Sequence, residues 1–145
     1  MLDLVLAIVH HVLIFGIFGA LLAELVALRR VASREDVVRI AVIDLWYGVL
    51  ATLVVIVGFS RANFAAKGWP YYSHNAFFWA KIATFAAIGI LSIRPTLVIA
   101  RWKRAGTVPD TAAVRPLRLY LHIELSLFVF LLIFAAAMAR GYGQL

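Results

Sequence analysis

The chain lacks cysteine and has few charged residues. The absence of cysteine excludes disulfide bonds, thiolate metal sites and a cysteine nucleophile. Charged residues make up 14% and hydrophobic residues 65% of the 145 positions. In soluble domains, about 25% of residues are charged and about 45–50% are apolar. The mean hydropathy is +0.98. Because so little polar surface is available for a water-soluble fold, we expect an integral membrane protein in contact with a lipid bilayer.

Several enzyme motifs are missing as well. The chain has no phosphate-binding glycine loop, no nucleophile elbow and no HExxH zinc signature. The net charge is +7, but the basic residues lie at the ends of apolar runs, where they face lipid headgroups. We therefore expect neither hydrolytic chemistry nor nucleic-acid binding.

Four long apolar runs account for most of the chain. A membrane-spanning helix needs about 20 mostly apolar residues, and we expect such helices over residues 3–28, 38–60, 76–100 and 116–139. The short connections favour antiparallel neighbours. The sequence therefore predicts an all-α, single-domain protein over residues 1–145, folded as an up-down-up-down bundle of four transmembrane helices.

Local signals predict where these helices begin and end. Ser33 and Asp36 form a capping-box pattern that starts the second helix a turn or two before the membrane. Asn75 and Pro116 are expected to open the third and fourth helices. Pro95 is expected to kink or end the third helix, because proline removes a backbone donor inside a helix.

The distribution of lysine and arginine predicts the orientation. The first and third loops carry nine basic residues: Arg29, Arg30, Arg34, Arg39, Arg101, Lys103, Arg104, Arg115 and Arg118. The second loop and the C-terminal tail carry three: Arg61, Lys67 and Arg140. Basic loops stay in the cytoplasm, so we expect both termini outside. Trp69, Tyr71 and Tyr72 then fit an interfacial aromatic belt at the outer surface.

Ionisable side chains inside the apolar runs fall into two layers. A charge at the centre of a spanning helix costs roughly 2.5–3.5 kcal/mol, so each one needs a reason. The expected inner polar layer, roughly 8–12 Å from the cytoplasmic ends of the helices, consists of Glu24, Asp44, Arg94, His122 and Glu124. The expected outer layer consists of His10, His11 and Lys81, with His74 just above them.

Two interpretations of the inner layer stay open. The first is structural: the carboxylates of Glu24, Asp44 and Glu124 pair with Arg94 or with loop arginines and set the helix register. The second is functional: these acids form a proton path or part of a substrate site.

The outer layer predicts a cofactor or metal site. Neutral imidazole is the usual protein ligand of haem iron and of copper or zinc, and His10, His11 and His74 are the candidate ligands. His10 shares a helix face with Glu24, which favours it as the residue that points into the bundle. The alternative is that these histidines only form hydrogen bonds between helices.

Several segments resemble one bacterial membrane family, known as domain of unknown function 2214. The stretch Gly68-Trp-Pro-Tyr-Tyr-Ser-His-Asn-Ala-Phe-Phe-Trp-Ala-Lys81 looks like its signature. The His10-His11 pair, the Ala23-Glu24-Leu25 step, Asp44 near Tyr47-Gly48, and Met138-Ala-Arg-Gly141 are similar as well. The resemblance covers nearly the whole chain and implies a multi-pass protein of the bacterial inner membrane, without implying a function.

More distantly, the layout resembles the HemJ-type protoporphyrinogen oxidases and the CopD-like membrane proteins. In the HemJ type, a histidine of the first helix and a lysine early in the third helix are the functional pair, and haem b is bound. The matching positions in this chain are His10 (or His11) and Lys81. The resemblance therefore implies a porphyrin site that includes Lys81.

The leading hypothesis is a b-type haem or porphyrin-binding bundle with a redox or electron-transfer role. His10 or His11 would be one axial ligand and His74 the second, while Lys81 would pair with a haem propionate or act catalytically in proton transfer. Such a haem-dependent oxidoreductase would exchange electrons with a redox partner or a quinone.

Two alternatives come from other functional classes. In one, His10, His11 and His74 collect copper or zinc and the inner acids form an exit for the ion. In the other, the chain is a structural, partner-binding membrane subunit. A homodimer is expected, because His122 and Glu124 point about 200° apart and cannot both face one core.

Overall fold

In the computed structural model, which describes residues 1–64 and 68–145, the chain forms four long helices and one short one. The long helices are α1 (Leu2–Arg29), α2 (Arg34–Phe64), α4 (Ala76–Ala105) and α5 (Thr111–Ala139), and the short one is α3 (Gly68–Ser73). The four long helices are long and apolar enough to cross a membrane. The prediction of an all-α protein with four spanning helices is therefore confirmed.

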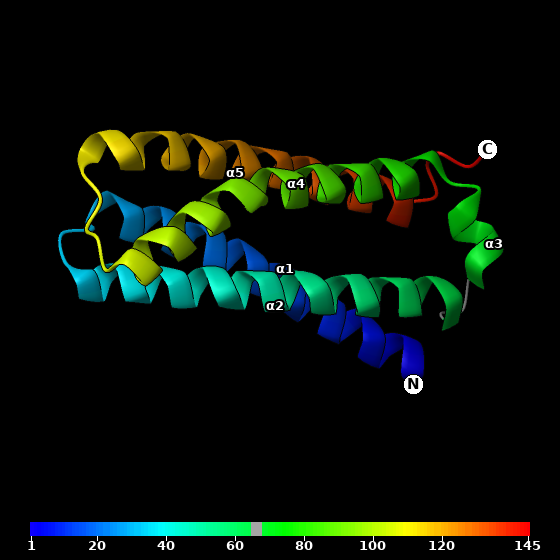
Figure 1. Ribbon diagram of the computed structural model, residues 1–145. Coiled ribbons are helices and arrows are strands. Elements are labelled where there is room, and N and C mark those ends of the chain that lie inside the picture. Colours follow the sequence, from blue (N-terminus) through cyan, green and yellow to red (C-terminus); the bar gives the residue numbers. More distant parts are fainter. Residues whose placement is uncertain (65–67) are drawn as a thin grey trace.

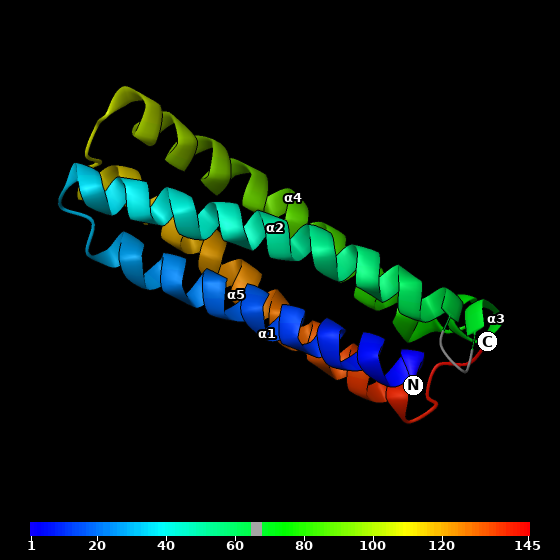
Figure 2. The ribbon, with the colours of Figure 1, turned by 90° about the horizontal axis from the view of Figure 1, so that it is seen from below.

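The long helices pack as two antiparallel hairpins placed side by side (Figures 1 and 2). Helix α1 packs most extensively against α2, and α4 against α5, while α1 also meets α5 and α2 meets α4. Both termini and α3 lie at the same end of the bundle (Figure 1). The up-down-up-down topology is thereby confirmed. Which end faces outside stays a prediction, and Lys67, one of the residues counted for it, lies outside the described residues.

The bundle exposes apolar side chains and keeps a narrow core. Phe15 and Ile90 are 72% and 69% exposed. Contact of such large apolar side chains with water would be unfavourable. The core is formed by buried aliphatic and aromatic side chains from all four long helices, among them Ile17, Leu21, Ile88 and Phe128. Helices that face lipid show this distribution, because hydrocarbon solvates apolar side chains as well as a protein core does.

The predicted helix starts are confirmed at two positions. The Asp36 backbone N–H donates to Ser33 Oγ at 3.1 Å, and the Ser33 N–H donates to Asp36 Oδ2 at 3.0 Å, which completes the capping box. The Asn75 side chain accepts hydrogen bonds from the N–H groups of Phe77 and Phe78 at the start of α4. Both caps satisfy backbone donors that a helix start leaves without partners.

Two expected helix boundaries at prolines were wrong: Pro95 does not end α4, and Pro116 does not open α5. Helix α4 continues through Pro95 to Ala105 and ends at Gly106, whose φ of 64° is the left-handed conformation that glycine adopts without strain. Helix α5 starts at Thr111, capped by the Asp110 side chain, and contains Pro116 in its second turn. In spanning helices proline is tolerated, because neighbouring groups compensate for the lost backbone hydrogen bond.

The C-terminal tail is tied to the start of α4. The Ala76 N–H donates to the Gly143 carbonyl at 2.8 Å, and the Leu145 N–H donates to the His74 carbonyl at 2.9 Å. The Asn75 side-chain amide donates to the Tyr142 carbonyl at 2.9 Å. The end of the chain therefore closes the bundle beside α3.

Candidate functional site

Three acidic side chains from three helices converge inside the bundle. Glu24 of α1 and Glu124 of α5 are 2% and 1% exposed, and Asp44 of α2 is partly buried. The Glu24 carboxyl lies within electrostatic range of both Asp44 and Glu124, and Asp44 lies within range of Glu124. We call these three residues the carboxyl cluster. The sequence predicted that all three belong to one layer.

Hydroxyl groups donate hydrogen bonds to two members of this cluster. The Tyr47 hydroxyl donates to Glu124 Oε2 at 3.4 Å, and the Thr96 hydroxyl donates to Asp44 Oδ1 at 2.6 Å. The other oxygen of Glu124 and the Oε1 atom of Glu24 are buried without a hydrogen-bond partner among the described residues. A buried carboxyl oxygen without a partner is costly and is usually explained by function.

Among the described residues, the carboxylates of the inner layer form no ion pair with Arg94 or with a loop arginine, so this expected pairing was wrong. Arg94 is exposed; its Nη1 donates to the Tyr120 hydroxyl at 2.8 Å, and its guanidinium lies 5.3 Å from the centre of that ring. Within residues 1–64 and 68–145, the one ion pair is Arg61–Asp3. Arg94 is two residues from Thr96, which places it about 200° around α4 from the side chain that contacts Asp44.

His122 also lies outside the carboxyl cluster. It is exposed, its Nδ1 lies 2.5 Å from the Arg118 carbonyl oxygen, and its Nε2 lies 3.5 Å from Nη2 of Arg29. His122 and Glu124 therefore do point to different sides of α5, as their spacing predicted.

A groove of about 540 Å³ runs between α2 and α4 beside the carboxyl cluster. Its polar lining residues are Asp44, Tyr47, Thr52, Ser92, Thr96 and Lys103. Gly48 and Gly89 also line it. Apart from the chain neighbours and the local backbone of the same helix, no atom lies within 4 Å of the position where a Cβ would stand at either glycine. The small residues of the two helices therefore leave a groove from which Asp44 and the Tyr47 phenol can be reached.

In the outer layer, the structure brings His10 and Lys81 into electrostatic range of each other, together with Arg61. His10 packs on Gly58 of α2: a Cβ at Gly58 would lie 3.2 Å from Cε1 of His10. The His10 Nδ1 atom is buried and has no hydrogen-bond partner in the described part of the chain. His10 is thus the histidine that points into the bundle, as predicted from the face it shares with Glu24.

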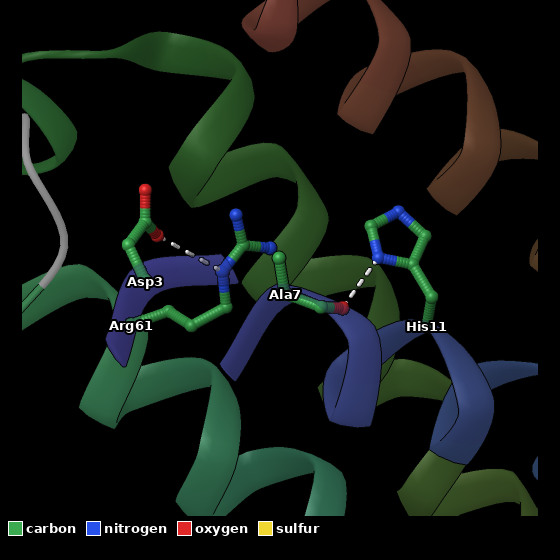
Figure 3. A network of polar contacts seen from close by, with 4 residues as sticks. All are labelled: Asp3, Ala7, His11 and Arg61. Carbon is green, nitrogen blue, oxygen red and sulfur yellow. Dashed lines mark hydrogen bonds and ion pairs between the residues drawn. The ribbon is translucent and has the colours of Figure 1, made fainter. Parts of the chain in front are cut away.

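His11 lies beside His10, with ring centres 6.4 Å apart, but neither it nor His74 is buried in the bundle. His11 is exposed, and its Nδ1 lies 2.6 Å from the Ala7 carbonyl oxygen of its own helix (Figure 3). His74 is exposed as well, with Nδ1 2.9 Å from the Pro70 carbonyl oxygen. Across the two described ranges, no three His, Cys, Asp or Glu side chains are grouped so that they could hold a metal ion.

These positions fit a haem only in part. His10 offers one imidazole, and Lys81 and Arg61 offer cations that suit propionate groups. His74, the expected second axial ligand, is exposed and its ring bonds to the Pro70 carbonyl, and the ring of His11, the alternative first ligand, bonds to the Ala7 carbonyl. The haem site therefore stays a prediction, with His10 as its candidate ligand.

Sequence reasoning missed several residues that complete the two polar groups. Tyr47, Thr96 and Ser92 carry hydroxyls, which hydropathy does not flag inside an apolar run. A signal for Tyr47 was present, because it lies three residues after Asp44 on the same helix face. Arg61 was counted for orientation alone, although it lies within electrostatic range of His10.

Comparison with known proteins identifies the family of this chain. No curated protein and no solved structure shows significant similarity to the chain. The family described as predicted membrane protein (DUF2214) matches residues 2–143. Because this match covers nearly the whole chain, the chain belongs to the DUF2214 family of membrane proteins. The matched span includes the carboxyl cluster, the groove and the outer basic residues.

Proposed function

We propose that this protein binds and releases protons at the carboxyl cluster and couples that exchange to the movement of a small substrate along the groove between α2 and α4. The observation that carries the proposal is the burial of Glu24 and Glu124, at 2% and 1% exposure, without an ion pair in the described part of the chain. A membrane protein that keeps such residues in its interior usually uses them for proton or ion transfer.

The physical reason is the low dielectric constant around the cluster. Three ionised carboxylates close together and without a counter-cation would repel one another strongly, and burial would add a desolvation cost. The cluster is therefore stable only when it shares protons or takes up a cation. Since the described residues form no three-ligand metal group, protons are the better match.

A chain of hydroxyl groups supports proton entry from the groove. The Tyr47 phenol lines the groove and donates to Glu124. The Ser92 hydroxyl lies in the same lining, where it donates to the Gly89 carbonyl at 2.8 Å. A hydroxyl donates one hydrogen bond and accepts others, so it can pass a proton along such a chain. Glu24 lies next, within electrostatic range of Glu124.

Infrared difference spectroscopy tests the proposal without knowledge of the substrate. In purified protein in lipid, we expect a protonated-carboxyl band that loses intensity as the pH is raised. Glu24→Gln and Glu124→Gln should each remove part of this band. Glu35→Gln is the matched control, because Glu35 is exposed at the start of α2. If both buried variants show the wild-type difference spectrum, the carboxyl cluster does not exchange protons and the proposal fails.

A second proposal, haem binding, is favoured by the proximity of His10 and Lys81. His10 would hold the iron, which supplies one-electron chemistry when bound, and Lys81 would pair with a propionate. Absorption spectra of the purified protein after haem supplementation should show a Soret band that shifts on reduction. The absence of that band, or an unchanged band in His10→Ala, would exclude it.

A further inference from the structure

We infer that Arg61, Lys81 and His10 form a binding site for a phosphate group, supplied by an anionic phospholipid, at the end of the bundle that carries both termini. This inference is independent of the proton exchange proposed above, because it concerns other residues at the opposite end of the helices. We call the three residues the basic cluster.

Three helices contribute one side chain each to the basic cluster. His10 comes from α1, Arg61 from α2 and Lys81 from α4. Lys81 lies within electrostatic range of Arg61, and His10 lies within range of both cations. Lys81 is partly buried, with its ammonium 5.4 Å from the centre of the Phe78 ring. His10 also packs on Gly58, which is one turn before Arg61 on α2. The three basic side chains therefore lie in one region between the helices.

Asp3 lies beside the basic cluster but does not neutralise its positive charge fully. Asp3 Oδ1 lies 4.0 Å from Arg61 Nε, a distance too long for a hydrogen bond (Figure 3). Asp3 Oδ1, Arg61 Nε and His10 Nδ1 are all buried atoms without a hydrogen-bond partner among the described residues. One carboxylate against two cations leaves a positive excess, together with donors that an oxyanion can satisfy.

The position of the cluster favours a lipid headgroup as the source of the phosphate. Arg61 is in the last turn of α2, and Lys81 is in the second turn of α4. Trp69 and Trp79 lie at the same end of the bundle and contact each other edge to face, with ring centres 6.5 Å apart. Tryptophan and basic residues together mark the headgroup level of a bilayer. A phospholipid at that level presents a phosphate, and arginine and lysine are its usual protein partners.

Native mass spectrometry can count retained lipids. The protein would be released from nanodiscs of phosphatidylcholine containing phosphatidylglycerol, and we expect retained phosphatidylglycerol to exceed its share of the bilayer. Removal of one cation near a membrane surface weakens anionic-lipid binding about fivefold. We therefore expect Arg61→Gln and Lys81→Gln each to lower retention about fivefold, whereas Lys81→Arg, which keeps the charge, should retain the lipid.

The matched control is Arg140→Gln, which removes an exposed basic residue beyond the end of α5, at the end of the bundle that carries α3. An equal loss of lipid in Arg140→Gln would overturn the inference, since retention would then follow net charge alone. Inorganic phosphate is the competing probe: displacement of the lipid by phosphate supports a phosphate site open to the solvent, and retention supports a site that takes the lipid headgroup.

A wild-type measurement covers the case in which the two glutamine variants fail to fold. Added phosphatidylglycerol should raise the unfolding temperature of the wild-type protein more than phosphatidylcholine does, because a ligand that binds only the folded state stabilises it. Equal unfolding temperatures in the two lipids would overturn the inference.

Discussion

Glu24 and Glu124 are buried among helices that otherwise present apolar side chains to the membrane. Each has a carboxyl oxygen without a hydrogen-bond partner among the described residues. Such groups lower the free energy of unfolding, since their desolvation is not offset by a partner. Their presence in the core is therefore better explained by function than by stability.

For Glu24→Met we expect a more stable protein that no longer exchanges protons at this position. Methionine is close to glutamate in size and needs no polar partner, and removal of an uncompensated buried charge can stabilise by about 1–3 kcal/mol. The measurement is the free energy of unfolding in detergent, with the infrared band as the functional readout. Glu35→Met is the control, expected within about 0.5 kcal/mol of wild type. A marked loss of stability in Glu24→Met would show that the carboxyl has a stabilising partner.

Tyr47→Phe tests the hydroxyl chain. The variant keeps the buried ring and removes the donor to Glu124 Oε2, so we expect a loss of stability of about 1 kcal/mol and slower proton uptake into proteoliposomes after a pH jump. Tyr142→Phe is a suitable control because Tyr142 is 63% exposed. Equal uptake rates in Tyr47→Phe and wild type would remove Tyr47 from the proton path.

Helices and their connections differ in how strongly local sequence determines them. The capping box of Ser33 and Asp36 and the Asn75 cap involve residues within three positions of one another, so they were predicted from spacing alone. The effect of Pro95 was not predicted from the sequence, because whether a proline ends a helix depends on the groups that surround it. In α4, Pro95 is buried and the helix continues to Ala105.

Asn75→Ala should loosen the end of the bundle that carries the tail. The Asn75 side chain accepts from two N–H groups of α4 and donates to the Tyr142 carbonyl. Loss of the cap and of a buried hydrogen bond should lower the free energy of unfolding by about 2 kcal/mol and speed amide exchange of residues 141–145. Asn63→Ala is the control, since exposed Asn63 donates to the Phe59 carbonyl of its own helix. Unchanged exchange in the tail would mean that other contacts hold it.

The assembled bundle places both termini at one end (Figure 1), and the orientation can be tested directly. Because the chain lacks cysteine, single cysteines at Asn63, Thr107 and Gln144 can be labelled with an impermeant thiol reagent. We expect the first and last to react in intact cells and Thr107→Cys only after permeabilisation, since the loops richer in lysine and arginine stay inside. The reverse pattern would invert the orientation. Equal labelling of all three would contradict four spanning helices.

The composition and the lengths of the apolar runs were enough to determine the number of spanning helices, their antiparallel order and the level of each ionisable side chain. Backbone hydrogen bonding must be satisfied within each helix in lipid, and that leaves few alternatives. Depth along a helix follows from residue number, because the rise per residue is constant.

Only the tertiary structure decided which ionisable groups at one level meet. That depends on the rotation of each helix about its axis, and four helices with apolar surfaces all around carry little rotational signal. Arg94 and Glu124 lie at similar depth, yet Arg94 turns outward to Tyr120 and forms no ion pair with the carboxyl cluster in the described part of the chain. For the same reason His10 meets Lys81 across the bundle, while the adjacent His11 faces outward and bonds to its own helix.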